Sequence, residues 1–202
     1  MELDAGAYTT AKVSFGFTAA AGACVKIIYA ECVSVADAEG NRRKELRDAW
    51  NDPTARMEGV YDTVYATGER QSFSPFWYRA FRFVRLEFPA DAGFEPDVMT
   101  FAPYFYPMDV TGSFFCSDGR LNRMWDISRN TVLCCTHEMY VDCPYYEQQM
   151  YPGDTRVQRP QRNHGGWKTA RARPSKTKVS PKPPKPLPFH ALRFPLYHFL
   201  SR

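Results

Sequence analysis

Three acidic side chains, Asp142, Glu147 and Asp154, lie five and seven residues apart in and around the segment YVDCPYYEQQMYPGD. Pro144 prevents a helix from continuing into this segment, and Pro152-Gly153 is a second break, so we predict a loop between them. On such a loop, one acidic side chain can stay protonated and act as a proton donor while its neighbours stay ionised. Acids that are merely solvated are the plain alternative.

Tyrosine is the second unusual component of this segment, which contains Tyr140, Tyr145, Tyr146 and Tyr151. The flat apolar face of a tyrosine can stack on a sugar ring, while its hydroxyl forms a hydrogen bond. Tyrosines also partly desolvate nearby carboxylates, which raises the pKa of an acid that must stay protonated. A protonated Glu147 beside ionised acids is the arrangement that glycosidic bond cleavage requires.

Alternating apolar residues predict a mainly β region before the loop. Residues 11–17, for example, place Val13, Phe15 and Phe17 on one face. The segment 36–56 is polar and rich in turn formers, so we predict a long loop there. Antiparallel strands in a β-sandwich fit this pattern better than βαβ units, and we assign residues 1–110 to a sandwich accessory domain. The predicted strands are 11–17, 25–35, 58–67, 77–88 and 97–106.

The segment 77–88 has the strongest strand pattern. Its predicted apolar face comprises Tyr78, Ala80, Val84, Leu86 and Phe88. Arg79, Arg82 and Arg85 in the same segment could bind an anion. Because Arg82 opposes the face that the other two share, we interpret the three as solvated or paired across strands.

The spacing of apolar residues changes after Asp118. One face of an amphipathic helix is predicted by residues at three- and four-residue steps, namely Leu121, Met124, Trp125, Ser128, Val132 and Cys135. Ser117 or Asp118 is placed to cap the first turn. We therefore predict a domain boundary near 107–117 and assign residues 111–158 to a helical domain with the acidic loop.

Composition separates an acidic body from a basic tail. The 202 residues are 44% hydrophobic and 15% aromatic, which predicts a folded core. Residues 159–202 hold 11 of the 26 Lys and Arg residues and no acid, so residues 1–158 hold the other 15 against all 22 acids, a net charge of −7. An acidic body argues against a specific nucleic-acid-binding fold. The tail also holds 8 of the 16 prolines, and we predict that it is disordered.

Two partners for the tail stay as alternatives. Its lysines and arginines could contact nucleic acid without sequence preference. The segment 180–188, SPKPPKPLP, could instead serve as a polyproline II ligand.

We expect no metal, cofactor or membrane partner. The six cysteines have no C-x-x-C spacing and are interpreted as buried free thiols. His137-Glu138 begins like an H-E-x-x-H zinc motif, but Val141 occupies the place of the second histidine. No stretch reaches the roughly 18 apolar residues of a membrane span, and the first residues lack a signal-peptide pattern, so a cytoplasmic location is favoured.

The segment DCPYYEQQMYPGDTRVQ, at 142–158, closely resembles the signature of bacterial and fungal α-L-rhamnosidases, glycoside hydrolase family 78. Residues 73–88 are similar to the family's β-sandwich segment before the catalytic domain, and residues 112–144 to the entry into its helical barrel. The resemblance implies an (α/α)₆ six-hairpin barrel that starts within 111–158. It also implies a rhamnose-containing glycoside as the substrate.

The resemblance further implies residue roles. Glu147 matches the general acid, which protonates the leaving-group oxygen. Asp142 and Asp154 match acids that bind the rhamnose hydroxyls, and we add Tyr146 and Arg156 as substrate-binding residues. Family members invert the anomeric configuration and use a second glutamate, far downstream in the barrel, as the general base. Its carboxyl group would lie about 6.5–9.5 Å from the acid to leave room for water.

The sequence departs from this pattern after Gln158, where a barrel helix should continue but Pro160 is predicted to break it. We therefore interpret the chain as a truncated rhamnosidase-like product with an unrelated tail, without the general base and inactive alone. Its first barrel helix would expose part of its apolar face, which predicts self-association. The non-enzymatic alternative is a β-sandwich carbohydrate-binding or interaction module with a basic tail.

Overall fold

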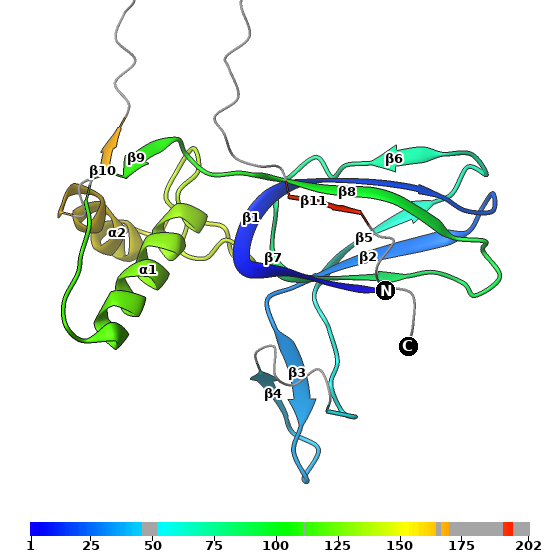
Figure 1. The fold of residues 1–202 in the computed structure, drawn as a ribbon, viewed down its shortest axis with the longest axis horizontal. Helices are drawn as coiled ribbons and strands as arrows, with labels where there is room; N and C mark the ends of the chain where they lie inside the picture. The colour runs from blue at the N-terminus through cyan, green and yellow to red at the C-terminus, as the bar shows by residue number, and fades with distance from the viewer. Residues whose placement is uncertain (46–51, 111, 165–166, 170–191, 196–202) are drawn as a thin grey trace, which may run out of the picture. The chain divides into compact units, whose positions relative to one another are not determined.

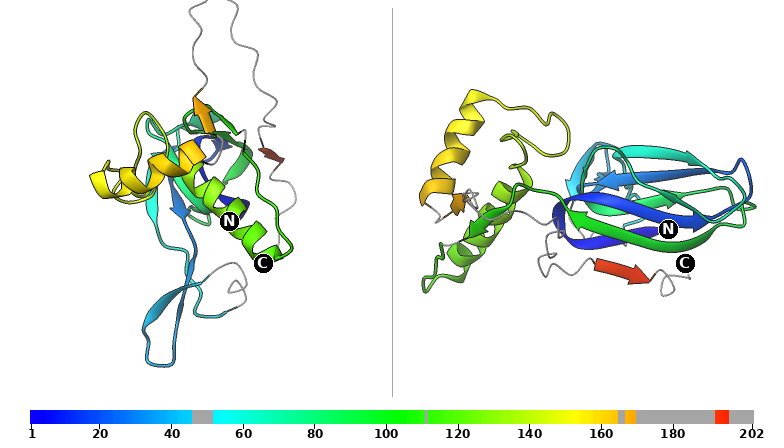
Figure 2. Two further views of the ribbon diagram at one scale, coloured as in Figure 1. Left: turned by 90° about the vertical axis from the view of Figure 1, so that its left-hand side faces the viewer. Right: turned by 90° about the horizontal axis from the view of Figure 1, so that it is seen from above.

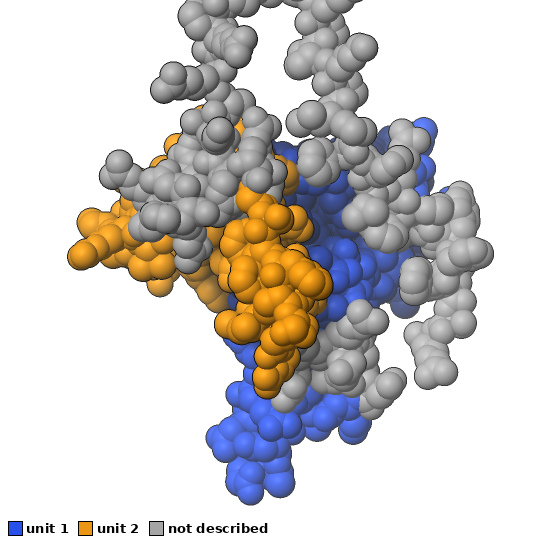
Figure 3. All heavy atoms as spheres, turned by 60° about the vertical axis from the view of Figure 1, so that its left-hand side comes forward, with its two compact units in different colours: residues 1–104, 191–202 blue, residues 105–190 orange. Residues whose placement is uncertain are grey.

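The computed structural model describes residues 1–45, 52–110, 112–164, 167–169 and 192–195. These residues belong to two compact units, which are coloured separately in Figure 3. Unit 1 comprises Met1–Tyr104 and Ala191–Arg202, and unit 2 comprises Phe105–His190. The division after Tyr104 lies close to the predicted boundary at 107–117.

Unit 1 is built on a curled antiparallel sheet, as Figure 1 shows. Within the described residues the sheet has seven strands in the order β11-β8-β1-β7-β2-β5, and β6 also pairs with β1. The mainly β, antiparallel fold predicted for this region is confirmed. The strands are β1 Glu2–Thr18, β2 Cys24–Ala30, β5 Val60–Tyr65, β6 Gln71–Phe73, β7 Arg79–Glu87, β8 Glu95–Pro103 and β11 Leu192–Pro195.

The long strand β1 joins the two layers of the sheet. Its first part, from Glu2 to Ala11, pairs with β7, and its second part, from Ala11 to Thr18, pairs with β8 and β6. The register shifts between Asp4 and Thr9, where Gly6 has a φ of 80° and donates its N–H to Asp4 Oδ1 at 2.7 Å. A glycine with positive φ in a bulge bends a strand strongly, which explains the curl of β1 in Figures 1 and 2.

The core of unit 1 lies between these layers. Val13, Phe15 and Phe17 on β1 are buried, as the alternation predicted. Phe15 and Phe17 stack with ring centroids 5.2 Å apart, and Phe94 stacks on Phe17 at 5.7 Å. Burial of these aromatic rings stabilises the packing of the two layers.

The three arginines of β7 form ion pairs across strands. The sequence analysis interpreted them as either solvated or paired in this way. Arg79 pairs with Asp62 on β5 at 2.5 Å, and Arg82 with Asp4 on β1 at 3.1 Å. Arg85 contacts Glu2 at 3.7 Å. All three therefore stabilise the sheet and form no isolated anion site.

A hairpin occupies part of the segment predicted as a loop. Strands β3 Val33–Ala36 and β4 Arg42–Glu45 pair antiparallel and extend away from the main sheet (Figure 1). Asp37 Oδ1 accepts the Asn41 N–H at 2.7 Å and closes the turn. The loop prediction was wrong for β4 because its residues, RRKE, have no apolar alternation.

Unit 2 contains two helices, α1 Gly119–Cys134 and α2 Pro152–His164, and the paired strands β9 Met108–Val110 and β10 Trp167–Thr169. The predicted cap of α1 is confirmed: Asp118 accepts the backbone N–H of Arg120 at 2.9 Å. Burial is limited to the C-terminal end of α1, where Val132 and Cys134 are buried.

Helix α2 corrects two sequence predictions. Pro152 was read as a break but begins this helix, because a proline in the first turn needs no backbone N–H. Pro160 was expected to end the helix after Gln158, yet α2 continues to His164. In the predicted tail, β10 and β11 are described as strands, and residues 165–166, 170–191 and 196–202 lie outside the described residues.

The described part of the chain contains neither a membrane-spanning helix nor a cluster of metal-binding side chains. None of its helices is long and apolar enough to cross a membrane. None of its groups of histidine, cysteine or acidic side chains could hold a metal ion.

Candidate active site

The acidic loop is anchored to the end of α1. The helix ends at Cys134 and is capped by Cys135, whose N–H donates to Thr131 O at 2.9 Å. The chain turns through a bridge between Thr136 and Tyr140, and Val141 N–H then donates to Cys135 O at 2.9 Å. This turn places Asp142 directly beside the helix end.

Asp142 and Gln149 close the loop. The backbone N–H of Asp142 donates to Gln149 O at 2.8 Å, and the backbone N–H of Gln149 donates to Asp142 Oδ1 at 2.9 Å. Pro144 and Tyr145 fill its interior and are buried. Asp142, a predicted site residue, thus closes the loop that carries Glu147.

Gln148 has the left-handed conformation, with a φ of 54°, and is the one described residue other than glycine with positive φ. Its backbone N–H donates to Cys143 O at 3.2 Å, and its side-chain amide donates to Pro144 O at 2.9 Å. These two bonds hold a strained turn immediately after Glu147. Such strain is common where a loop must aim a functional side chain.

Glu147 and Tyr146 point outward at the tip of this loop. Both are exposed, while Tyr145 is buried and meets Tyr146 edge-to-face with ring centroids 4.5 Å apart. Glu147 therefore lacks the desolvation by tyrosines that the sequence predicted. Its backbone N–H contacts Cys143 Sγ at 3.4 Å.

Tyr151 lies within electrostatic range of all three acids. Its hydroxyl forms a hydrogen bond with the Glu147 carboxylate, and this bond, with the charge of Glu147, raises the pKa of Tyr151. The charges of Asp142 and Asp154 contribute to the same shift. The sequence analysis treated Tyr151 only as one of four stacking residues. Its position four residues after Glu147 was the signal that could have identified it.

Asp142 is held in its ionised form. Partial burial opposes ionisation, but hydrogen bonds from the backbone N–H groups of Gln149 and Cys143, and from the Cys143 thiol, outweigh it and lower the pKa of Asp142. The neighbouring thiol of Cys135 behaves oppositely, because burial raises its pKa to about 12. At neutral pH Asp142 is therefore anionic, while the neighbouring Cys135 thiol is not ionised.

Helix α2 supplies the last two predicted site residues. Asp154 lies in its first turn, where the helix dipole favours a negative charge. Gln158 fastens the helix to the loop, since its Nε2 donates to Val141 O at 2.8 Å. Arg156 is exposed, and no hydrogen bond or ion pair between it and the three acids is found among the described residues. The charges of Asp142, Glu147 and Asp154 thus all act on Tyr151, whereas no contact between Arg156 and these residues is found in the described part of the chain.

The region that contains this loop is similar to a known protein family. Residues 109–164 match the six-hairpin glycosidase domain of bacterial α-L-rhamnosidases. The chain is thus similar to α-L-rhamnosidases, which include members of glycoside hydrolase family 78. An α-L-rhamnosidase of Formosa agariphila is 30% identical over 101 residues, which are 48% of this chain and 10% of that protein.

Solved rhamnosidases share the fold. The family 78 rhamnosidase of Bacillus sp. GL1 superposes with a TM-score of 0.65 at 25% identity, over 82% of this chain and 16% of that one. A Klebsiella oxytoca rhamnosidase with rhamnose bound has a TM-score of 0.57 at 14% identity, over 80% of this chain and 32% of that one, and supports the fold alone. The chain spans from about a tenth to a third of the length of these rhamnosidases.

Proposed function

We propose that this chain provides the acid side of an α-L-rhamnosidase active site, in which Glu147 protonates the leaving-group oxygen of a terminal α-L-rhamnoside. The supporting observation is the closure of the loop by Asp142 and Gln149, which holds Glu147 at its exposed tip. A proton donor held in place lowers the barrier to cleavage of the glycosidic bond.

The remaining side chains have different tasks in this proposal. The ionised Asp142 accepts hydrogen bonds from sugar hydroxyls, and so does Asp154 at the start of α2. The exposed ring of Tyr146 offers a stacking surface for the sugar. Arg156, which is exposed on α2, is assigned to a contact with the substrate.

Inverting hydrolysis needs a second carboxylate that activates water on the opposite face of the sugar. The family resemblance places that base on a later part of the barrel and assigns it to no residue of this chain. We therefore propose that the chain binds a rhamnoside but does not turn it over alone.

The test uses the purified chain and p-nitrophenyl α-L-rhamnopyranoside. We expect saturation-transfer NMR to detect binding of the intact glycoside and absorbance to detect no release of p-nitrophenol. Asp142→Asn and Asp154→Asn should each abolish saturation transfer. Asp126→Asn, which changes an exposed acid on α1, is the matched control and should retain it.

Three results would contradict parts of the proposal. Absence of saturation transfer would show that the loop does not bind a rhamnoside. Turnover that persists in Glu147→Gln would show that Glu147 is not the proton donor. Turnover that Glu147→Gln abolishes supports Glu147 as the acid but contradicts the inactivity of the chain alone.

A further inference from the structure

The outer face of strands β8, β1 and β6 in unit 1 is a second chemically distinctive surface. Along β1 the side chains of Val13, Phe15 and Phe17 enter the core, so those of Lys12, Ser14 and Gly16 lie on the opposite face. This outer face has no role in the acid-loop chemistry. Most sheet faces of this kind are simply solvated, so its particular side chains decide whether it can bind a ligand.

A polar groove of about 380 Å³ lies on this face. Hydroxyl groups line it from three neighbouring strands: Ser14 pairs in register with Thr100 on β8, and its Oγ lies 3.4 Å from that of Ser72 on β6. Gly16 leaves the floor open, because a Cβ atom there would lie 3.1 Å from Asp97 Oδ2. A row of hydroxyls offers both donors and acceptors to a ligand.

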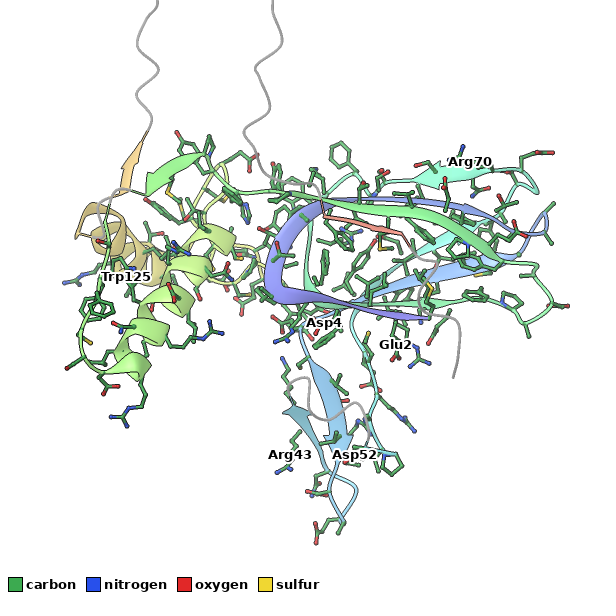
Figure 4. The ribbon with its side chains drawn as sticks, in the orientation of Figure 1. Glu2, Asp4, Arg43, Asp52, Arg70 and Trp125 are labelled. Atoms are coloured by element: carbon green, nitrogen blue, oxygen red, sulfur yellow. The ribbon has the colours of Figure 1, made fainter. Side chains whose placement is uncertain are left out.

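An internally neutralised ion pair closes one end of the groove. Arg70, labelled in Figure 4, donates from Nε to Asp97 Oδ2 at 2.9 Å and from Nη2 to the same oxygen. In the described structure these bonds leave Asp97 Oδ1 and Arg70 Nη1 available to a ligand. Because the two charges cancel, this end favours a neutral ligand with hydroxyl groups over an anion or a metal ion.

Exposed aromatic rings lie at the other end of the same face. Lys12 Nζ donates to Phe76 O at 2.7 Å and lies 5.8 Å from the Trp77 ring centroid and 4.9 Å from that of Tyr104. Trp77 is 43% exposed and Phe76 is 93% exposed. Lysine thus holds large apolar rings at the surface, where a sugar ring could stack.

We propose that the outer face of β8, β1 and β6 binds a neutral oligosaccharide, with one sugar ring stacked on Trp77 and the next held by Ser14, Thr100 and the Arg70–Asp97 pair. Lys12 and Gly16 are four residues apart on one strand, which corresponds to about 13 Å and fits roughly two linked sugar rings. This site is independent of the function proposed for the acid loop.

NMR titration of the isotopically labelled full chain tests the proposal with three neutral probes, cellotriose, maltotriose and rutinose. We expect at least one probe to shift the Trp77 indole resonance and the Ser14 and Thr100 amides, with a dissociation constant on the order of millimolar. Trp77→Ala and Asp97→Asn should each weaken binding roughly tenfold. Thr63→Val, an exposed threonine on β5 in the other layer, should change nothing.

The same titration can overturn the proposal. It is wrong if none of the three sugars shifts these resonances at tens of millimolar. It is also wrong if the shifts survive both Trp77→Ala and Asp97→Asn, or if they are confined to residues 142–154. The last result would place sugar binding at the acid loop alone and leave the outer face as a solvated surface.

Discussion

At the scale of single residues, Tyr151 reports on the state of Glu147. The Tyr151 pKa lies above its ordinary value of 10.0 because its hydroxyl bonds to the Glu147 carboxylate and because that carboxylate is charged. Glu147→Gln removes the charge, so we expect the Tyr151 pKa to fall toward 10.0. Titration of ¹³Cζ-labelled tyrosine, assigned with Tyr151→Phe, measures the change. An unaltered Tyr151 pKa in Glu147→Gln, equal to that in Asp126→Asn, would show that the two side chains do not interact.

Asp142 gives a second prediction at this scale. Its pKa lies below the ordinary 3.8, so its hydrogen bond stabilises the loop above that pH and is lost only as the pH falls through the lowered value. We expect the Gln149 amide resonance, whose N–H contacts Asp142 Oδ1, to titrate with a midpoint below 3.8. In Asp142→Ala this transition should vanish. A midpoint at or above 3.8 in the original chain would contradict the loop closure described above.

At the scale of elements, the cap of α1 can be tested directly. Asp118→Ala removes the acceptor of the Arg120 N–H, a change that costs about 1 kcal/mol at a helix N-cap. Hydrogen exchange of the first-turn amides should therefore accelerate roughly fivefold. Asp126→Ala, in the middle of the same helix, serves as control and should not accelerate it. Equal exchange in the two variants would mean that Asp118 does not cap the helix.

The predictability of the elements depended on how many faces each one buries. The strand containing Val13, Phe15 and Phe17 was predictable because one face is buried and the other is polar. Strand β7 lies between β1 and β2, and Phe81 and Phe83 are buried along with the predicted Ala80 and Val84. Period-two alternation fails for a strand that is covered on both sides. Phe88, expected on the buried face, is 37% exposed just beyond the strand end.

The candidate site shows the same limit. Motif spacing predicted Asp142, Glu147 and Asp154 as site residues, because a loop between prolines can be recognised in the sequence. The backbone closure by Gln149 and the left-handed Gln148 could not be predicted, since they depend on hydrogen bonds between the two ends of the loop. Prolines were misread in α2 because position within a helix, and not proline itself, decides whether a helix tolerates it.

At the scale of the whole molecule, exposed apolar side chains on α1 favour self-association. Met124 is 60% and Ile127 is 53% exposed. Burial of such side chains against a second copy is favourable, so we predict concentration-dependent oligomers in sedimentation velocity. Met124→Lys with Ile127→Lys should shift the chain toward monomer, whereas Tyr65→Lys on β5 should not. A monomeric original chain at all concentrations would contradict the prediction.

The central claim is that Glu147 meets the glycosidic oxygen of a bound rhamnoside, and ¹³C NMR of labelled glutamate carboxyl groups tests it most directly. With Glu147→Gln to assign the resonance, p-nitrophenyl α-L-rhamnopyranoside is added to the original chain. We predict that the Glu147 carboxyl resonance shifts progressively to saturation while that of Glu138 stays fixed. A Glu147 resonance that does not move, while the same glycoside binds elsewhere on the chain, would contradict the account.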